Sequence, residues 1–294
     1  MTNMHDIKTR IKSIKETKQI TNAMRLISAS KLKKARRQLD ATLPYFTKVK
    51  STIADILIHS SNVDSIFFDL RHEKEGKKKG YLIITGDRGL AGSYNHNLMN
   101  FIEEVLEGDR SSVLFVAGQI GRIYLLEKGY NVDINFDYHV QDPSIFMARE
   151  IAEMLVKYFK DGILDEVNLI YTMMNSSIQF DPQIIKLLPL DPQDLLKDTE
   201  TGLTQSGIDD LLIYEPSTDA VLEVLIGKYI KGFIYGAFVE SFTSEQTARL
   251  TAMDNATTNA DKMLHQLSLQ YNSARQTAIT QEITEIVSGI TALK

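Results

Sequence analysis

Glycine and proline are almost absent from both ends of this chain. The first glycine is Gly76, and Pro44 is the only proline before it. No proline follows Pro216, and no glycine lies between Gly236 and Gly289. Glycine adds backbone freedom and proline removes a hydrogen-bond donor, so these two residues commonly end helices. Both ends of the chain are therefore free to continue as long, uninterrupted helices.

Apolar residues in the N-terminal segment recur at steps of three and four, the spacing of one helix face. Asn3 can cap the start of this helix, with Asp6 in its first turn. Between Ile14 and Met24 the stripe weakens, which predicts either a slip of register or a polar partner helix. The stripe consists of Ile7, Ile11, Ile14, the weaker positions Lys18 and Thr21, and then Leu32, Ala35, Leu39, Thr42, Phe46, Val49, Ile53 and Ile56.

The C-terminal segment has the same spacing, and Ser217 is its predicted N-cap. About seventy helical residues at 1.5 Å each give a rod on the order of 100 Å. One alternative is that Thr243–Gln246, which fits a capping box, begins a separate helix. The expected stripe is Met253, Ala256, Ala260, Met263, Leu267, Tyr271, Ala274 and Ala278, moving over by one residue to Ile279, Ile283, Ile286, Ile290 and Leu293.

Two amphipathic helices at opposite ends of one chain bury their stripes by packing on each other. Alternating steps of three and four favour a left-handed antiparallel coiled coil. An ordinary helical bundle is the alternative, but it needs more helices than this chain supplies.

The middle of the chain alternates predicted strands at 79–85, 112–117 and 167–172 with helices at 95–107, 119–127 and 143–159. This order predicts a small, largely parallel sheet. The fold class is therefore α/β, with a long antiparallel coiled coil and a small Rossmann-like domain. The expected parts are an N-terminal long helix at 1–75, the α/β domain at 76–190, a polar loop at 191–216 and a C-terminal long helix at 217–294.

The segment Gly86–Gly92 follows the first predicted strand and reads G-x-x-G-x-x-G. It lacks the G-x-G-x-x-G spacing and the G-K-[ST] ending of phosphate-binding loops. Turn geometry and close strand–helix packing explain these glycines better than phosphate binding, although an unrecognised enzyme with a pocket at this loop is an alternative. The chain has no cysteine and its six histidines are scattered, so we expect no metal site, cofactor or catalytic residue.

Positive charge is concentrated near the N-terminus. The net charge is −5, yet residues 1–50 hold 13 basic and 3 acidic residues, leaving 20 basic and 35 acidic residues elsewhere. Aromatic residues are absent before Tyr45, which argues against nucleic acid and favours an acidic protein surface over a merely solvated face. The basic residues are Lys8, Arg10, Lys12, Lys15, Lys18, Arg25, Lys31, Lys33, Lys34, Arg36 and Arg37.

No apolar leader or stretch of eighteen apolar residues occurs in the sequence. We therefore expect a protein that is neither secreted nor membrane-spanning.

Several segments together resemble the gamma subunit of F-type ATP synthases, the central rotor shaft, over nearly the whole chain. Ile290, Ala91 and Ser93 depart from the family pattern. The segments that carry the resemblance are Ile7–Ile11, Ile20–Met24, Ala29–Ala35, Thr85–Gly92, Ser244–Met253 and, most specifically, Ala274–Gly289.

The resemblance implies a mechanism and a set of partners. The coiled coil is expected inside a hexamer of alpha and beta subunits, three of each to one copy of this chain. The α/β domain, with an epsilon subunit, is expected on a membrane ring of c subunits. Together with the lack of an Arg/Ser-rich leader, this partner implies the cytoplasmic face of a bacterial plasma membrane. The ATP sites belong to beta. A coiled-coil scaffold or a nucleic-acid arm explains the rod and its charge, but not the match at the C-terminal end.

Residue roles also follow from the resemblance. The basic residues Lys8 through Arg37 are expected to face acidic segments of beta, and an unpaired apolar stripe at the tip must bury itself on something. Arg275, Gln276, Thr280 and Glu282 match positions that meet alpha and beta loops, and the apolar tip that enters a hydrophobic sleeve is Ile283, Ile286, Ile290 and Leu293.

Overall fold

The structure is a computed structural model in which the chain forms two compact units. One unit is Met1–Ser30 with Arg249–Lys294, and the other is Lys31–Ala248. Two predicted positions, the cap Asn3 and the tip residue Leu293, lie outside the described residues. The structure describes residues 4–59, 65–68, 76–174, 180–197, 214–215 and 217–292.

Two long helices, α1 (Met4–His59) and α6 (Thr218–Ala292), each run through parts of both units. The prediction of a long helix at each end is confirmed. Ser217 caps α6, because its Oγ accepts a hydrogen bond from the backbone N–H of Ala220 at 3.2 Å. The alternative of a separate helix starting at Thr243 is wrong, since α6 continues through that segment without a break.

The first predicted segment, 1–75, is helical only to His59. Within the described residues beyond it lies a short 3-10 helix, Ile66–Phe68, whose buried Phe67 accepts a hydrogen bond from the Leu190 N–H at 2.7 Å. The predicted polar loop 191–216 begins with helix α5 (Pro192–Lys197). The rest of that loop is described only at 214–215.

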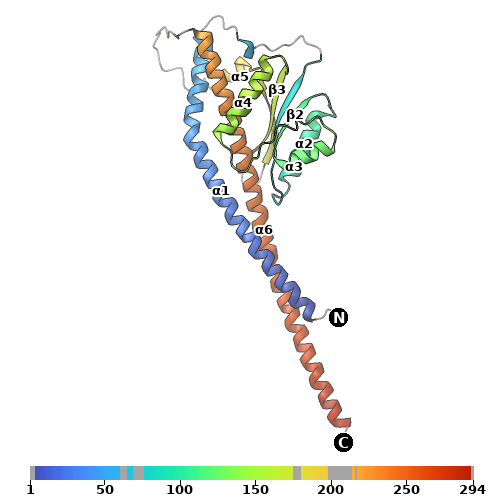
Figure 1. Ribbon diagram of the computed structural model, residues 1–294. Helices are drawn as coiled ribbons and strands as arrows, with labels where there is room; N and C mark the ends of the chain where they lie inside the picture. The colour runs from blue at the N-terminus through green and yellow to red at the C-terminus, as the bar shows by residue number, and fades with distance from the viewer. Residues whose placement is uncertain are drawn as a thin grey trace. The chain divides into compact units, whose positions relative to one another are not determined.

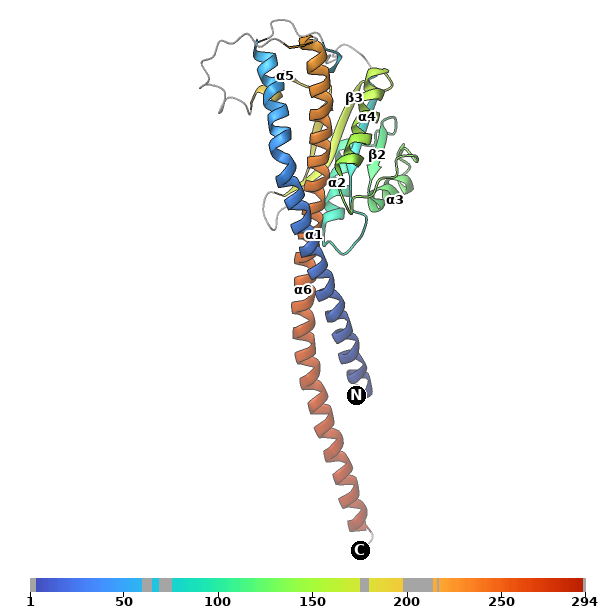
Figure 2. The ribbon, with the colours of Figure 1, turned by 60° about the vertical axis from the view of Figure 1, so that its left-hand side comes forward.

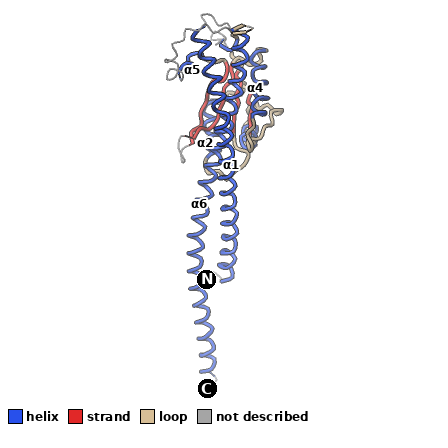
Figure 3. Tube along the Cα trace, turned by 90° about the vertical axis from the view of Figure 1, so that its left-hand side faces the viewer, coloured by secondary structure: helices blue, strands red, loops and turns tan. Residues whose placement is uncertain are grey.

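In the unit that contains the N-terminus, α1 and α6 run antiparallel and side by side (Figures 2 and 3). Lys18 Nζ lies 2.5 Å from Asp261 Oδ1, and Thr21 Oγ1 lies 3.1 Å from Thr257 Oγ1. Lys18 and Thr21 are half-buried, like Ile14 before them and Met24 after them, so the spacing of three and four continues through this part of α1. The weak part of the stripe therefore faces a polar layer of α6, and the predicted slip of register does not occur.

Between Met253 and Ala278, where α6 packs on α1, one position of the predicted stripe is wrong. Met263 is 53% exposed, and the neighbouring Leu264 is half-buried in its place. The covered face steps by four from Ala260 to Leu264 and then by three to Leu267, so a side chain at 263 points outward.

The unit Lys31–Ala248 contains a four-stranded sheet with the order β2-β1-β3-β4. β1 pairs in parallel with both β2 and β3, whereas β4 pairs antiparallel with β3. The three strands expected from the sequence are present, and β4 is an addition. The strands are β1 (Lys79–Ile84), β2 (Val113–Ala117), β3 (Glu166–Met174) and β4 (Phe180–Leu188).

Helices cover both faces of this sheet (Figure 1). On one face α2 (Tyr94–Leu106) and α3 (Gln119–Glu127) pack on Tyr81 and Ile83. On the other face, α4 (Ile145–Lys160) and the parts of α1 and α6 in this unit pack on Leu82 and Ile84. Successive residues of β1 thus enter opposite cores, as the pleat of a strand requires.

The same unit holds a close contact between α1 and α6. A Cβ atom placed on Gly232 of α6 would lie 2.1 Å from Cδ1 of Phe46 on α1. Gly227, one and a half turns earlier in α6, has no atom within 4 Å of the same position. The Phe46 ring therefore occupies the space that a side chain at residue 232 would need.

We predict opposite effects for alanine at these two glycines. G227A should raise the free energy of unfolding by about 1 kcal/mol, because alanine favours a helix interior over glycine. G232A should lower it by about 1–3 kcal/mol, because the added methyl overpacks the Phe46 site. Thermal unfolding of the full chain measures both changes.

A second variant separates packing from helix propensity. In the background of F46L, which shortens the side chain, the G232A change should cost less than it does beside the native phenyl ring. Equal stabilities of G227A and G232A would show that the close contact is absent.

Candidate functional site

The glycine loop after β1 is a tight packing joint. Thr85 Oγ1 donates a hydrogen bond to the Ala117 carbonyl at 2.9 Å and accepts one from the Gly121 N–H at 3.1 Å. A Cβ on Gly121 would lie 2.3 Å from Thr85 Cγ2, so the start of α3 touches the loop directly. Within the loop, Gly92 has a φ of +58°, which glycine adopts without strain. Turn geometry thus accounts for Gly92 and close packing for Gly121. A Cβ atom on Gly89 would meet no atom within 4 Å, so packing does not explain that glycine.

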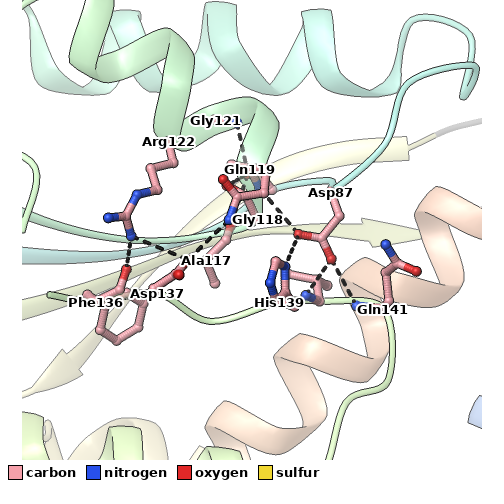
Figure 4. Close-up of polar contacts among 12 residues, drawn as sticks. Asp87, Ala117, Gly118, Gln119, Gly121, Arg122, Phe136, Asp137, His139 and Gln141 are labelled. Atoms are coloured by element: carbon pink, nitrogen blue, oxygen red, sulfur yellow. Dashed lines mark hydrogen bonds and ion pairs between the residues drawn. The ribbon is translucent and has the colours of Figure 1, made fainter. Parts of the chain in front are cut away.

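Asp87 is the centre of the polar contacts at this joint (Figure 4). Its side chain is 3% exposed. The carboxylate accepts hydrogen bonds from the backbone N–H groups of Val140 at 2.8 Å, Gln141 at 3.1 Å and Gln119 at 3.3 Å, and His139 Nδ1 lies 3.3 Å away. The chain's own donors therefore engage this buried carboxylate, which ties the loop to α3 and to the segment before α4.

A neighbouring arginine has a similar structural role. Arg122 of α3 donates to the carbonyl oxygens of Phe136 and Ile134, both at 2.5 Å. Its guanidinium lies 3.6 Å from the exposed carboxylate of Asp137 (Figure 4). Asp87 and Arg122 thus both hold loops of the domain in place.

A groove of about 550 Å³ lies among α1, β3 and α6 in the unit Lys31–Ala248. Its lining is mainly apolar and aromatic, with Phe46, Tyr171 and Phe233 among the larger side chains, and none of it comes from the glycine loop. Burial, and then the charge of Glu240, raise the pKa of Tyr171, so this phenol stays protonated at neutral pH. No cluster of three or more metal-ligating side chains occurs within the described residues.

The eleven predicted basic contact residues follow α1 without gathering into one site. Lys18, Arg25 and Lys31 are half-buried, and the other eight are exposed. Lys34 pairs with Asp142 at 3.0 Å, in addition to the pair between Lys18 and Asp261. The other nine form no ion pair among the described residues, although Arg25 donates hydrogen bonds to Asn22 Oδ1.

The end of α6 extends beyond the first residue of α1 within their unit (Figures 2 and 3). Beyond Ala278 the side chains of α6 are exposed through Ile290. Ile283, Ile286 and Ile290 are 56%, 63% and 59% exposed, so the apolar tip has no covering helix in the described chain. The predicted polar contacts Arg275, Gln276, Thr280 and Glu282 are exposed as well.

Comparison with known proteins identifies the family. The ATP synthase family model matches residues 3–293. The ATP synthase gamma chain of Acetivibrio thermocellus is 54% identical over 295 residues and covers 100% of both chains. That of Ruminiclostridium cellulolyticum is 56% identical over 293 residues and covers 99% of both. The chain belongs to the ATP synthase gamma-chain family.

A solved structure agrees on the fold. A chain of the mitochondrial ATP synthase of Euglena gracilis matches with a TM-score of 0.68 at 18% identity, covering 99% of this chain and 94% of the other. As a family member, the chain is a subunit of an ATP synthase. In the part of the chain that the structure describes, no helix is long and apolar enough to cross a membrane.

Sequence reasoning missed one group of functional candidates. Residues 241–247 of α6 are buried on every side although most are polar, with Ser241 1% and Ser244 0% exposed. An amphipathic helix would expose one face of such a turn. The run of Ser, Thr, Glu and Gln was the available signal, and it was interpreted as a capping box.

We predict that Asp87 is a structural residue. D87N should lower the free energy of unfolding by about 1–3 kcal/mol, because an amide group turns an acceptor into a donor that faces backbone N–H groups. The matched control is D137N, whose carboxylate is 60% exposed and should change stability by less than about 0.5 kcal/mol. Denaturant unfolding of the full chain compares them, and a D87N chain as stable as wild type would contradict the described network.

Proposed function

We propose that this chain is the central rotor shaft of an ATP synthase, turning inside a hexamer of three alpha and three beta subunits. The observation that carries the proposal is the uncovered end of α6. Three isoleucines stand more than half exposed on a helix that has lost its partner. Exposed apolar surface of this kind on a folded chain marks an interaction site.

The shaft acts without chemistry of its own. The ATP sites belong to beta, and this chain is a non-catalytic subunit that couples ion flow through the c ring to those sites. Because one shaft meets three beta subunits, each beta subunit makes different contacts with it. Any contact that favours one conformation changes the nucleotide affinity of that site by its differential free energy, so rotation cycles the three affinities.

The basic residues of α1 are proposed to face acidic segments of beta. Exposure of Lys33 and Arg37 without an ion-pair partner in the described chain supports this role. Arg275, Gln276, Thr280 and Glu282 are proposed to meet alpha and beta loops. The tip from Ile283 to Leu293 is proposed to lie in an apolar sleeve formed by the hexamer.

The α/β domain is proposed to rest, with an epsilon subunit, on the c ring at the cytoplasmic face of the plasma membrane. In this arrangement the functional parts are the shaft helices α1 (Met4–His59) and α6 (Thr218–Ala292), the domain 76–190 and the segment 191–216. The chain is a peripheral part of the complex, held there by protein contacts.

Co-expression with the alpha and beta subunits of the same host tests this function. We expect a tagged chain to purify with three copies of each, and ATP hydrolysis by the hexamer to depend on its presence. A chain that stays alone, or that binds nucleic acid with a steep salt dependence, would contradict the proposal and favour a basic binding arm.

The control for that experiment is a tip variant, I283S/I286S/I290S. The isolated variant should melt at the wild-type temperature, because these side chains are already exposed, but it should recover less alpha and beta. L267S, at a half-buried position of the helix pair, should instead lower the melting temperature of the isolated chain.

The next variant neutralises three neighbouring basic residues of α1, Lys31, Lys33 and Lys34. The K31Q/K33Q/K34Q variant should fold, since its one described ion pair, Lys34 with Asp142, is exposed and worth at most about 1 kcal/mol. We expect ATP-driven ion pumping by the assembled complex to fall at least about twofold relative to ATP hydrolysis.

The matched control removes the same charge from exposed lysines elsewhere. K157Q/K186Q/K228Q should leave the ratio of pumping to hydrolysis unchanged. Equal ratios in both triple variants would remove the basic cluster from the coupling mechanism.

A further inference from the structure

The buried polar turn of α6 lies against the end of β3. β1 accompanies β3 only as far as the pair Ile83 and Ile170. Beyond Ile170, in the described part of the sheet, no strand pairs with that edge of β3, although β3 continues to Met174. Buried backbone N–H and C=O groups at this edge need other partners.

Side chains of α6 supply those partners. Ser241 Oγ accepts a hydrogen bond from the Thr172 N–H at 3.1 Å, and Ser244 Oγ donates one to the Thr172 carbonyl at 3.3 Å. One turn of helix thus bonds both backbone groups of one residue, as a neighbouring strand would. Glu240 Oε1 accepts a third bond from the Met174 N–H at 3.2 Å.

The opposite edge of β3 is arranged to match. Thr172 lies across from Pro182 of β4, and proline has no N–H to donate. Because the backbone groups of Thr172 point to α6, this pair needs no hydrogen bond across the ladder. The Thr172 hydroxyl is buried and has no hydrogen-bond partner among the described residues. Only the backbone of Thr172, and not its side chain, forms hydrogen bonds with the two serines.

A second element joins the same turn of α6. The Tyr94 hydroxyl, at the start of α2, donates a hydrogen bond to the Ser241 carbonyl at 3.2 Å. Tyr94 and Ala91 also pack with Ala248 in a small apolar cluster. The start of α2 and the end of β3 therefore both form hydrogen bonds with the turn of α6 that contains Ser241.

We propose that Ser241 and Ser244 are positioning residues for coupling, forming a clasp with the Thr172 backbone that fixes the rotation of α6 relative to the α/β domain. This inference rests on the proposed function, in which torque passes between that domain and the shaft. The clasp consists of Ser241, Ser244 and the backbone of Thr172.

The geometry suits resistance to twisting. The hydrophobic effect is non-directional, so burial of apolar area alone does not select one rotation of α6. Hydrogen bonds depend on distance and angle. Side-chain oxygens lie about 5 Å from a helix axis, so turning α6 by about 20° shifts them about 2 Å and breaks both clasp bonds.

The test compares S241A/S244A with T243V in the assembled complex. Thr243 is in the same turn and 4% exposed, but its hydroxyl donates to the Glu240 carbonyl of its own helix. We expect the number of ions pumped per ATP hydrolysed to fall at least about twofold in S241A/S244A, with hydrolysis retained and T243V unchanged. A wild-type ratio in S241A/S244A would overturn the clasp.

Amide hydrogen exchange of the full chain gives an independent readout. The Thr172 amide should exchange at least about tenfold faster in S241A than in wild type or T243V. Unchanged exchange in S241A would overturn the inference. If S241A/S244A fails to assemble, the S244A single variant takes its place in the pumping assay, with the same expected direction and the same overturning result.

The wild-type chain separates this inference from the proposed function. Failure of the wild-type chain to bind alpha and beta would overturn both. Assembly and coupled pumping by wild type, together with unchanged coupling in the clasp variants, would overturn the clasp alone.

Discussion

The antiparallel register of α1 against α6 determines which surfaces this chain buries and which it leaves exposed. Lys18 beside Asp261 sets it in one unit, and Phe46 against Gly232 sets it in the other. In the described part of the chain, this register leaves the side chains of α6 beyond Ala278 exposed. The exposed tip is thus a consequence of pairing two helices of unequal length, and its apolar residues need an outside surface to cover them.

Within the unit Lys31–Ala248, β3 connects the elements that surround it. It pairs with β1 on one edge for its first half and with the serines of α6 on that edge near its end, while β4 occupies the other edge. Asp87 connects loops in a similar way, because backbone N–H groups from another loop donate hydrogen bonds to its buried carboxylate. The domain is therefore fixed by directional polar contacts at its margins and by apolar packing on both faces of its sheet.

The sequence was sufficient for the long helices, because the lack of glycine and proline leaves few ways to end them. Apolar runs in the sequence also located three strands. They did not predict β4, because this edge strand contains Pro182 and several polar residues in place of an apolar run. Met263 was misplaced because a stripe of mixed three and four steps permits either of two neighbouring positions. The clasp could not be predicted from the sequence, because Ser241 and Thr172 are 69 residues apart. Their hydrogen bond uses the backbone of Thr172, so it does not depend on the side-chain pattern of β3.

Under the proposed function, the two kinds of contact suit the two ends of α6. A shaft must turn freely against its bearing, and the isoleucines of the tip offer apolar surface, which is non-directional and roughly equal in strength at every angle. The same shaft must not turn against the domain that drives it. There α6 presents buried serines whose hydrogen bonds fail after a small rotation. The isoleucines at the C-terminal end of α6 and the serines at 241 and 244 thus meet opposite mechanical requirements on a single helix.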